Sequence, residues 1–197
     1  LNYDGGDTAT IGGNWGTNGG AALETVAHPL AGFGNAPRQS ALPGANRKTL
    51  SRAWNTAAAG AVYGEYTYEF DMYKTATTFE TSAQIRRFEM TAGVTNLTQV
   101  LDTQFVRFAN DSKLYVNSSN PGSSQALSGT YQAGLNYKFK VSMNSVNRKY
   151  SLYLVSGKID NIDRTNYFLG EFNLVNTAAN KFVGVSMLQF NSNMADN

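Results

Sequence analysis

The stretch from Asn136 to Lys158, NYKFKVSMNSVNRKYSLYLVSGK, alternates apolar and polar residues twice, on either side of a polar break. Successive side chains of a β-strand point to opposite faces, so a period of two residues predicts a strand with one buried face. Two such runs joined by a short polar segment predict an antiparallel hairpin. The face expected to be buried holds Tyr137, Phe139, Val141, Met143, Tyr150, Leu152 and Leu154. The opposite face holds Lys138, Lys140, Ser142, Ser151, Tyr153 and Val155, and it meets either water or a ligand.

Similar short patterns fill the chain from Gly64 onward. In EYTYEFDMY, one face holds Tyr66, Tyr68, Phe70 and Met72, and the other holds Glu65, Thr67, Glu69, Asp71 and Tyr73. The later runs are SAQIRRFEMT, TQFVRFAN, KLYVN, YFLGEFNL and KFVGVSMLQFNS. Many short strands separated by turn residues, with almost no helical pattern, predict an all-β fold. We expect a two-sheet antiparallel β-sandwich, with a barrel as the alternative.

Length and composition limit the classes of protein to consider. The 197 residues suffice for a single domain over residues 1–197 with its own core. Only 15% of residues are charged, and the net charge is +2 without a basic block, so we expect no nucleic-acid partner. No apolar run reaches the ~20 residues of a membrane span. The chain starts at Leu1 without a signal peptide, so we expect a processed or excised module of a larger secreted protein.

Three segments carry a resemblance to a known family: the strand ending YEFDMY, the hairpin YKFKVSMN…KYSLYLVSGK and the closing strand FVGVSMLQFNS. Over residues 60–192 the pattern resembles the concanavalin A-like, or laminin-G-like, jelly-roll sandwiches. In those domains a penultimate hairpin alternates aromatic and apolar residues before a glycine, which maps here onto Tyr137–Met143 and Tyr150–Gly157. The resemblance implies carbohydrate chemistry, in lectins, carbohydrate-binding modules, polysaccharide lyases or glycoside hydrolases, while some members bind proteins. One fold hosts many activities, so the site residues must decide among them.

The carboxylates of the EYTYEFDMY strand are the candidate catalytic pair of a glycoside hydrolase. A retaining glycosidase needs two carboxylates ~5–5.5 Å apart across the sugar. Related hydrolases place them on one strand as Glu-x-Asp-x-Glu. Glu65, Glu69 and Asp71 share one face here, although the Trp and Ile that usually frame such a site are missing. The alternative interpretation is a solvated polar face.

A lyase would use a different set of residues. It needs a base such as Tyr or His, together with cationic or amide groups that neutralise a uronate carboxylate. Gln84 and Arg86 share a parity in SAQIRRFEM and suit the second role. Alginate-lyase-like sandwiches carry Gln-Ile-His, whereas this chain reads QIRRFE, and its only histidine, His28, lies in a Gly/Ala-rich segment.

The N-terminal DGGD segment is a candidate calcium site. Asp4 and Asp7 flank two glycines in a turn that can offer carboxylate and backbone oxygens to Ca²⁺. Sandwich modules often hold a structural Ca²⁺ away from the sugar site. Gly-Asp clusters are also ordinary turn chemistry, so both interpretations stay open.

Aromatic and amide side chains are the candidate sugar-binding groups. Sugar recognition stacks an aromatic ring under the apolar face of a pyranose and bonds its hydroxyls with polar groups. Trp15 and Trp54 lie among small and polar residues, and Tyr73 lies on the polar face of its strand. Gln84, Arg86, Arg107, Lys138 and Lys140 would form a basic face if they converge on one sheet, favouring uronic-acid polymers. If they scatter, they are solubilising charges.

We therefore expect a secreted or cell-surface, monomeric module that binds a polysaccharide without catalysis and targets an attached enzyme. Its predicted ligand-binding residues are Trp15, Trp54, Tyr73, Gln84, Arg86 and Arg107, with Asp4 and Asp7 as ligands of a structural Ca²⁺. One alternative is an enzyme of the same fold, a lyase that uses Arg86 and a Tyr or a hydrolase that uses Glu69 and Asp71. The other is a protein-binding adhesion domain.

Overall fold

A computed structural model of the 197-residue chain describes its strands and most of their connections. The backbone is described for residues 15–18, 22–27, 35–40, 48–53, 65–74, 76, 80–91, 97–117, 124–144, 146–174 and 180–193. Side chains are described for residues 65, 67–74, 76, 80–83, 104–116, 124–144 and 146–174. No helix in these ranges is long and apolar enough to cross a membrane.

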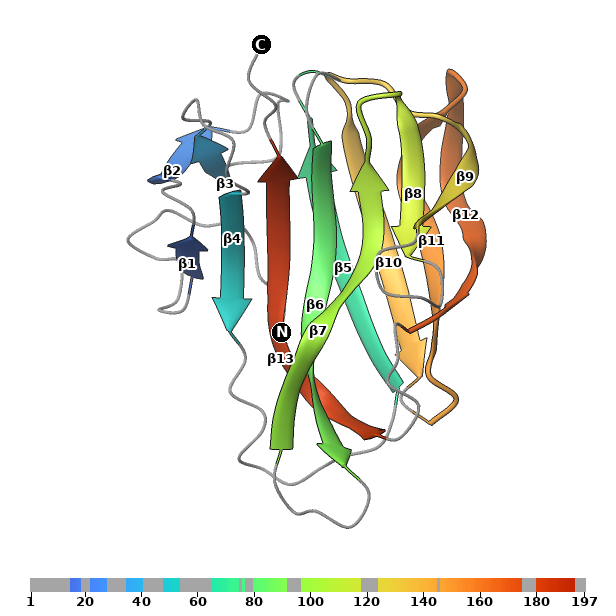
Figure 1. The fold of residues 1–197 in the computed structure, drawn as a ribbon. Helices are drawn as coiled ribbons and strands as arrows, with labels where there is room; N and C mark the ends of the chain where they lie inside the picture. Colours follow the sequence, from blue (N-terminus) through green and yellow to red (C-terminus); the bar gives the residue numbers. More distant parts are fainter. Residues whose placement is uncertain are drawn as a thin grey trace.

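The described residues form antiparallel strands arranged in two main sheets (Figure 1). The strands are β1 (Trp15–Asn18), β2 (Ala22–Ala27), β3 (Asn35–Ser40), β4 (Lys48–Ala53), β5 (Glu65–Tyr73), β6 (Glu80–Thr91), β7 (Leu97–Phe108), β8 (Lys113–Asn117), β9 (Ser124–Thr130), β10 (Asn136–Asn144), β11 (Lys149–Ile159), β12 (Ile162–Asn173) and β13 (Asn180–Asn193). The seven-stranded sheet has the order β1-β4-β13-β6-β7-β8-β9, and the four-stranded sheet has the order β12-β11-β10-β5. Strands β2 and β3 pair separately. The predicted all-β, two-sheet antiparallel sandwich is confirmed.

The predicted hairpin is the centre of the four-stranded sheet. Strands β10 and β11 pair antiparallel, and β10 also pairs with β5. Burial alternates along β10 as the sequence pattern predicts, and the same holds for β11 from Lys149 to Leu154. The inward residues of the hairpin, all almost fully buried, are Tyr137, Phe139, Val141, Met143, Tyr150, Leu152 and Leu154.

The core lies between the two sheets and is rich in aromatic rings. Phe108 of β7 meets Tyr137 and Phe139 of β10 edge to face, with ring centroids 5.2 and 5.8 Å apart. Phe105 of β7 contacts Tyr150 of β11 in the same way at 5.2 Å. Such pairs stabilise a core by about 0.5–1.5 kcal/mol each beyond the burial of their area. These contacts hold the inner faces of the two sheets together.

Two β-bulges adjust the strands to this core. The register of β7 against β6 shifts between Ala83 and Gln84, so that Phe105 and Val106 are both fully buried. The Tyr150 hydroxyl approaches the carbonyl oxygens of Gln104 and Phe105, at 3.4 and 3.5 Å. The buried Tyr150 hydroxyl thereby offers a hydrogen bond to backbone carbonyl groups at the point where the bulge interrupts the β6–β7 ladder.

The second bulge lies in β11. The register against β10 jumps from Leu154 to Ser156, which leaves Val155 as the extra residue and reverses the alternation that follows. Gly157 then falls against the core, where a Cβ atom built on it would lie 2.7 Å from Cδ1 of Tyr137. The ring of Tyr137 is fully buried among other core side chains, so it cannot easily move away from an atom added at Gly157.

A tight turn connects β11 to β12. Its two central residues, Asp160 and Asn161, have φ angles of 52° and 65°, in the left-handed region that Asp and Asn tolerate better than most residues. Oδ1 of Asp160 accepts hydrogen bonds from the backbone N–H (2.8 Å) and the hydroxyl (3.0 Å) of Thr130 in β9. The turn thus ties the edge strand β12 to the opposite sheet.

Substituting Gly157 with Ala should therefore destabilise the fold by ~2 kcal/mol or more, because the added methyl group overpacks Tyr137 and because the φ of 154° at this position is one that L residues rarely adopt. Gly134 is the matched control: its φ is 79° and an added Cβ meets no atom within 4 Å, so Gly134→Ala should lose only about 1 kcal/mol from backbone strain. Urea denaturation of both variants measures the difference. Equal losses would contradict the packing of Gly157 against Tyr137.

Candidate functional site

The predicted polar residues do not converge on one surface. Gln84 and Arg86 lie in β6 and Arg107 lies in β7, all in the seven-stranded sheet. Lys138 and Lys140 lie in β10, in the four-stranded sheet. Of the two alternatives, convergence of all five residues on one sheet is excluded, because strands that resemble each other in pattern belong to different sheets. Trp54, Asp4, Asp7 and His28 lie outside the described residues.

Within the seven-stranded sheet, strand register does not bring Trp15 and Gln84 together. Trp15 of β1 pairs with Arg52 of β4, Arg52 with Leu188 of β13, and Leu188 with Ile85 of β6. Gln84 therefore occupies the register row next to that of Trp15, three strands away. Beside Arg86, the pairing of β6 with β13 and the pairing of β6 with β7 both shift register. The face of Arg86 therefore does not follow from simple alternation along β6.

Arg107 lies in a polar cluster on the outer face of this sheet. Its Nη1 donates to Oε2 of Glu80 at 3.1 Å, and its Nη2 donates to the Ser124 hydroxyl at 3.2 Å. The guanidinium lies 4.8 Å from the ring centroid of Tyr115, whose hydroxyl donates to Asp111 at 2.7 Å. That hydrogen bond raises the pKa of Tyr115 and lowers the pKa of Asp111. The charge of Arg107 is therefore already compensated by Glu80.

The outer face of the four-stranded sheet carries a row of aromatic and charged side chains. Register aligns Phe168 of β12 with Tyr153 of β11, Tyr153 with Lys140 of β10, and Lys140 with Glu69 of β5. We call these four residues the aromatic row. The rings of Tyr153 and Phe168 lie 5.2 Å apart at an angle of 46°, and Phe168 is 52% exposed. The hydrophobic ring of Phe168 is thus presented to solvent beside that of Tyr153.

Hydroxyl groups flank the aromatic row on both sides. One neighbouring register row contains Glu171, Ser151, Ser142 and Thr67. The other contains Thr165, Ser156, Lys138 and Asp71. Adjacent rows on one face of a sheet are ~7 Å apart. A ligand lying on the two rings would therefore meet donors and acceptors within the width of one sugar residue.

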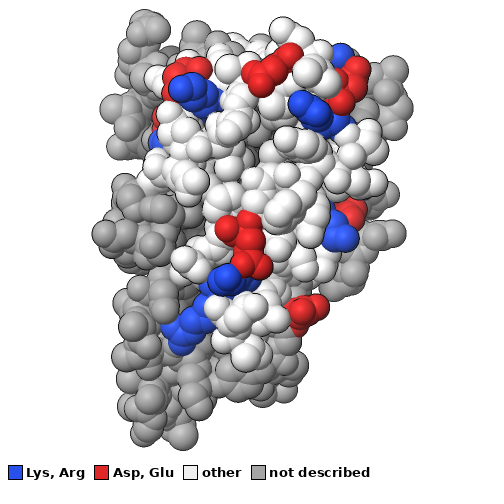
Figure 2. All heavy atoms as spheres, turned by 90° about the vertical axis from the view of Figure 1, so that its right-hand side faces the viewer, with Lys and Arg blue, Asp and Glu red and all other residues white. Residues whose placement is uncertain are grey.

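The charged side chains of this face are mostly held in pairs. Lysine ammonium groups contact carboxylates in Lys138–Glu69 (3.1 Å), Lys149–Glu171 (2.5 Å) and Lys158–Asp163 (2.9 Å). Figure 2 views the side of the molecule where β12 and β9 lie, and basic and acidic groups lie next to each other there, with uncharged surface between them. The outer face of the hairpin, whose role the sequence does not decide, is thus a polar surface around two aromatic rings, with most of its charged groups in ion pairs.

Glu69 and Asp71, the candidate hydrolase pair, both lie exposed on this outer face, as their parity predicts. Glu69 is paired with Lys138, and Asp71 accepts a hydrogen bond from Nδ2 of Asn136 at 2.7 Å. Tyr73, a predicted ligand-binding residue, ends the same strand and is partly buried. The four-stranded sheet thus brings Tyr73, Glu69 and Asp71 to the face of the aromatic row.

Tyr153 and Phe168 were not among the residues predicted to bind a ligand. The sequence nevertheless contains a pattern that indicates an exposed aromatic ring at each of these two positions. Tyr153 occupies the outward parity of the hairpin, where an aromatic residue is unusual without a partner. Tyr167 and Phe168 are consecutive aromatics in a strand, so both cannot face the core, and they are 41% and 52% exposed.

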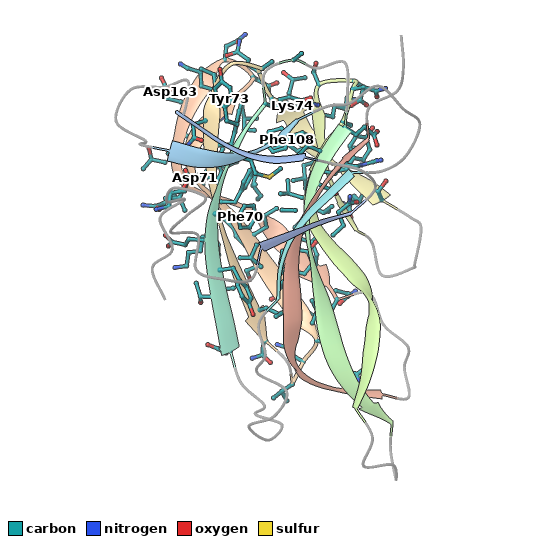
Figure 3. All side chains as sticks on the ribbon, turned by 90° about the vertical axis from the view of Figure 1, so that its left-hand side faces the viewer. Phe70, Asp71, Tyr73, Lys74, Phe108 and Asp163 are labelled. Carbon is teal, nitrogen blue, oxygen red and sulfur yellow. The ribbon has the colours of Figure 1, made fainter. Side chains whose placement is uncertain are left out.

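A buried lysine lies at one end of the space between the sheets, close to Phe108 (Figure 3). Nζ of Lys74 donates to the hydroxyl of Tyr131 at 2.6 Å and approaches the carbonyl oxygen of Phe108 at 3.4 Å. The Tyr131 hydroxyl in turn donates to the Ala109 carbonyl at 2.6 Å. Burial lowers the pKa of Lys74 to about 8, against a smaller opposite effect of Glu80. Burial also raises the pKa of Tyr131, which keeps its hydroxyl a donor.

Through these hydrogen bonds Lys74, which follows β5, links the four-stranded sheet to residues that follow β7 and β9 of the other sheet. We call Lys74 and Tyr131 the polar clasp.

No group of three or more His, Cys, Asp or Glu side chains able to hold a metal ion occurs among the described residues. The predicted Ca²⁺ ligands Asp4 and Asp7 lie outside that part of the chain, so the calcium site stays a prediction.

Comparisons with known proteins identify no family. No family model matches the chain, and no curated protein matches it. Among solved structures, the chain is similar to LamAcat from Zobellia galactanivorans, with 9% sequence identity and a TM-score of 0.42. The match covers 93% of this chain and 67% of LamAcat. It is too distant to support a conclusion about function.

The lowered pKa of Lys74 predicts how stability changes with pH. Between about pH 8 and pH 10.5 the unfolded chain binds more protons at this residue than the folded protein, so the contribution of Lys74 to stability should rise with pH across that window. In Lys74→Met this rise, on the order of 1–3 kcal/mol, should be absent. The other titratable groups that act on Lys74 or Tyr131 are Glu80, Tyr131 itself, Tyr137 and Asp111, and both proteins retain them.

Urea denaturation at pH 7.5 and pH 9.5 measures the effect as a difference between the two proteins. Parallel profiles for the wild type and Lys74→Met would show that Lys74 does not titrate in this window.

Proposed function

We propose that this protein is a non-catalytic module that binds a polysaccharide on the outer face of its four-stranded sheet. The observation that carries the proposal is the aromatic row, in which Tyr153 and the exposed Phe168 lie side by side on a sheet face lined with hydroxyl groups. The proposed setting is a secreted or cell-surface protein, in which the module targets an attached enzyme to its substrate.

The two rings offer the apolar part of a sugar site. The C–H groups of a pyranose form an apolar face, and an aromatic ring beneath it removes both surfaces from water. Phe168 is 52% exposed, so part of its apolar ring faces water. A stacked sugar would cover that part. Tyr153 extends the surface toward the centre of the sheet and adds a hydroxyl group.

The surrounding polar groups suit sugar hydroxyls. Serine and threonine hydroxyls both donate and accept, as sugar hydroxyls do. The ion pairs Lys149–Glu171 and Lys158–Asp163 restrain long side chains on either side of the rings. A restrained donor or acceptor loses less conformational entropy when it binds a ligand. Low overall charge is also consistent with a ligand recognised by hydrogen bonds and stacking.

The structure offers less for the two alternatives. A hydrolase would use Glu69 and Asp71, and both side chains already have partners on this face. A protein-binding domain that adds a strand at β12 would need a regular free edge. Instead, β12 contains Asn166 with a φ of 48° and a register shift opposite Leu152 and Tyr153. Such bulges discourage strand addition at an edge.

Changing either ring to Ala should weaken polysaccharide binding about tenfold or more, that is by ~1.4 kcal/mol or more, because the stacking surface is lost. Retardation of Phe168→Ala and Tyr153→Ala in affinity gels containing plant and algal polysaccharides measures the loss. Val146→Ala is the matched control, since Val146 is 72% exposed but lies in the β10–β11 turn. It should bind like the wild type.

The same polysaccharides, incubated with the protein, are assayed for reducing ends and for unsaturated products. Polymers that remain intact are expected from a binding module. Products that disappear in Glu69→Gln would make this domain a hydrolase, and products that disappear in Arg86→Ala would make it a lyase. Retardation that is unchanged in both ring variants would move the binding site to another surface.

A further inference from the structure

Lys140 differs from the other lysines on the outer face of the four-stranded sheet. Within the described residues, Lys138, Lys149 and Lys158 each contact a carboxylate, whereas Lys140 has no ion-pair partner. Glu69 lies opposite Lys140 in register, but its carboxylate is taken by Lys138. Lys140 is thus an ammonium group whose charge is not compensated by direct contact.

The position of this free charge relates it to the proposed sugar site. Lys140 pairs in register with Tyr153, whose ring lies 5.2 Å from that of Phe168. Neighbouring strands are ~4.8 Å apart, so the ammonium group of Lys140 can reach a substituent of a sugar stacked on Tyr153. The stem of Lys140 is partly buried beside its neighbours, which restricts the directions open to the charge.

The carboxylates of the face do not cancel this effect at the rings. Asp71 and Glu65 are held by Asn136 and Asn144 rather than by lysines. Both lie in β5, which pairs with the strand of Lys140 but is the strand of this sheet farthest from β12 and Phe168. Glu171 and Asp163, which lie on β12 itself, are each paired with a lysine. Among the lysines of this outer face, Lys140 is therefore the one that no carboxylate contacts within the described residues.

We infer that Lys140 gives the site a preference for acidic polysaccharides, by binding an anionic substituent of the sugar that stacks on Tyr153. The inference rests on the proposed function and adds the class of ligand to it. The substituent is a carboxylate or a sulfate ester, since both present oxygens to an ammonium group. An ammonium near the surface attracts an anion only modestly and loses part of the attraction to salt. The preference should therefore be several-fold and should weaken at high ionic strength.

Matched polymers that differ only in charge test the inference. Polygalacturonate and its methyl ester form the carboxylate pair, and dextran sulfate and dextran form the sulfate pair. The wild type should bind the anionic member of at least one pair about fivefold more tightly at low salt, and sodium chloride should reduce the ratio. Lys140→Met should bring the ratio close to one. Lys113→Met is the control, because it removes an exposed lysine of β8 in the other sheet and should keep the preference.

The outcomes separate this inference from the proposed function. Equal binding of charged and neutral partners, or a preference that survives in Lys140→Met, overturns the role of Lys140 and leaves the binding module intact. Binding only to neutral polysaccharides of the wider panel would likewise overturn the role of Lys140 and leave the binding module intact. Failure to bind any polysaccharide overturns both. A thermal unfolding midpoint of Lys140→Met equal to that of the wild type shows that the variant is folded. A changed ratio of anionic to neutral binding then reflects the lost charge.

Discussion

The packing of Phe108 against the hairpin is the contact on which the two sheets most depend. Its ring meets Tyr131, Tyr137 and Phe139 edge to face, with centroids between 4.7 and 5.8 Å apart. Because Phe108 belongs to the seven-stranded sheet and the other rings belong to β10 and the segment before it, the contact joins the two layers. Aromatic rings that interlock in this geometry leave little freedom to slide. The packing between the inner faces of the two sheets therefore also fixes the positions of their outer faces.

The hairpin of β10 and β11 therefore has two roles that follow from one alternating pattern. Every second residue packs into the core, and the residues between them form the outer face. The rigidity of the buried set is transmitted to Tyr153 and Lys140 because they share a backbone with fully buried neighbours. A binding surface on a strand interior is more precisely placed than one on a loop. A ligand-binding site is for this reason expected on the sheet face.

The extent to which sequence predicts this molecule depends on the range over which each residue acts. Alternation along a strand is local, and it predicted the buried and exposed residues of β10 and of β5 among the described side chains. Bulges at Phe105 and Val155 broke the alternation, because they arise from how two strands meet rather than from one strand alone.

Strand neighbours were beyond the reach of the sequence for a similar reason. Lys138 and Arg107 have the same kind of local pattern but lie on different sheets, and only the topology separates them. Phe168 was overlooked because its partner, Tyr153, lies in another strand. The pair becomes visible only through the β11–β12 register.

An NMR titration of the protein with a short oligosaccharide, prepared from a polysaccharide that retards it, locates the binding surface residue by residue. The account predicts that the largest shifts occur in the ring signals of Tyr153 and Phe168 and in the backbone amides of their neighbours in β11 and β12. The signals of Arg107 and Tyr115, on the opposite outer face, should stay in place. Shifts that gather at Arg107 and Tyr115, with Phe168 unmoved, would contradict it and would place the ligand on the seven-stranded sheet.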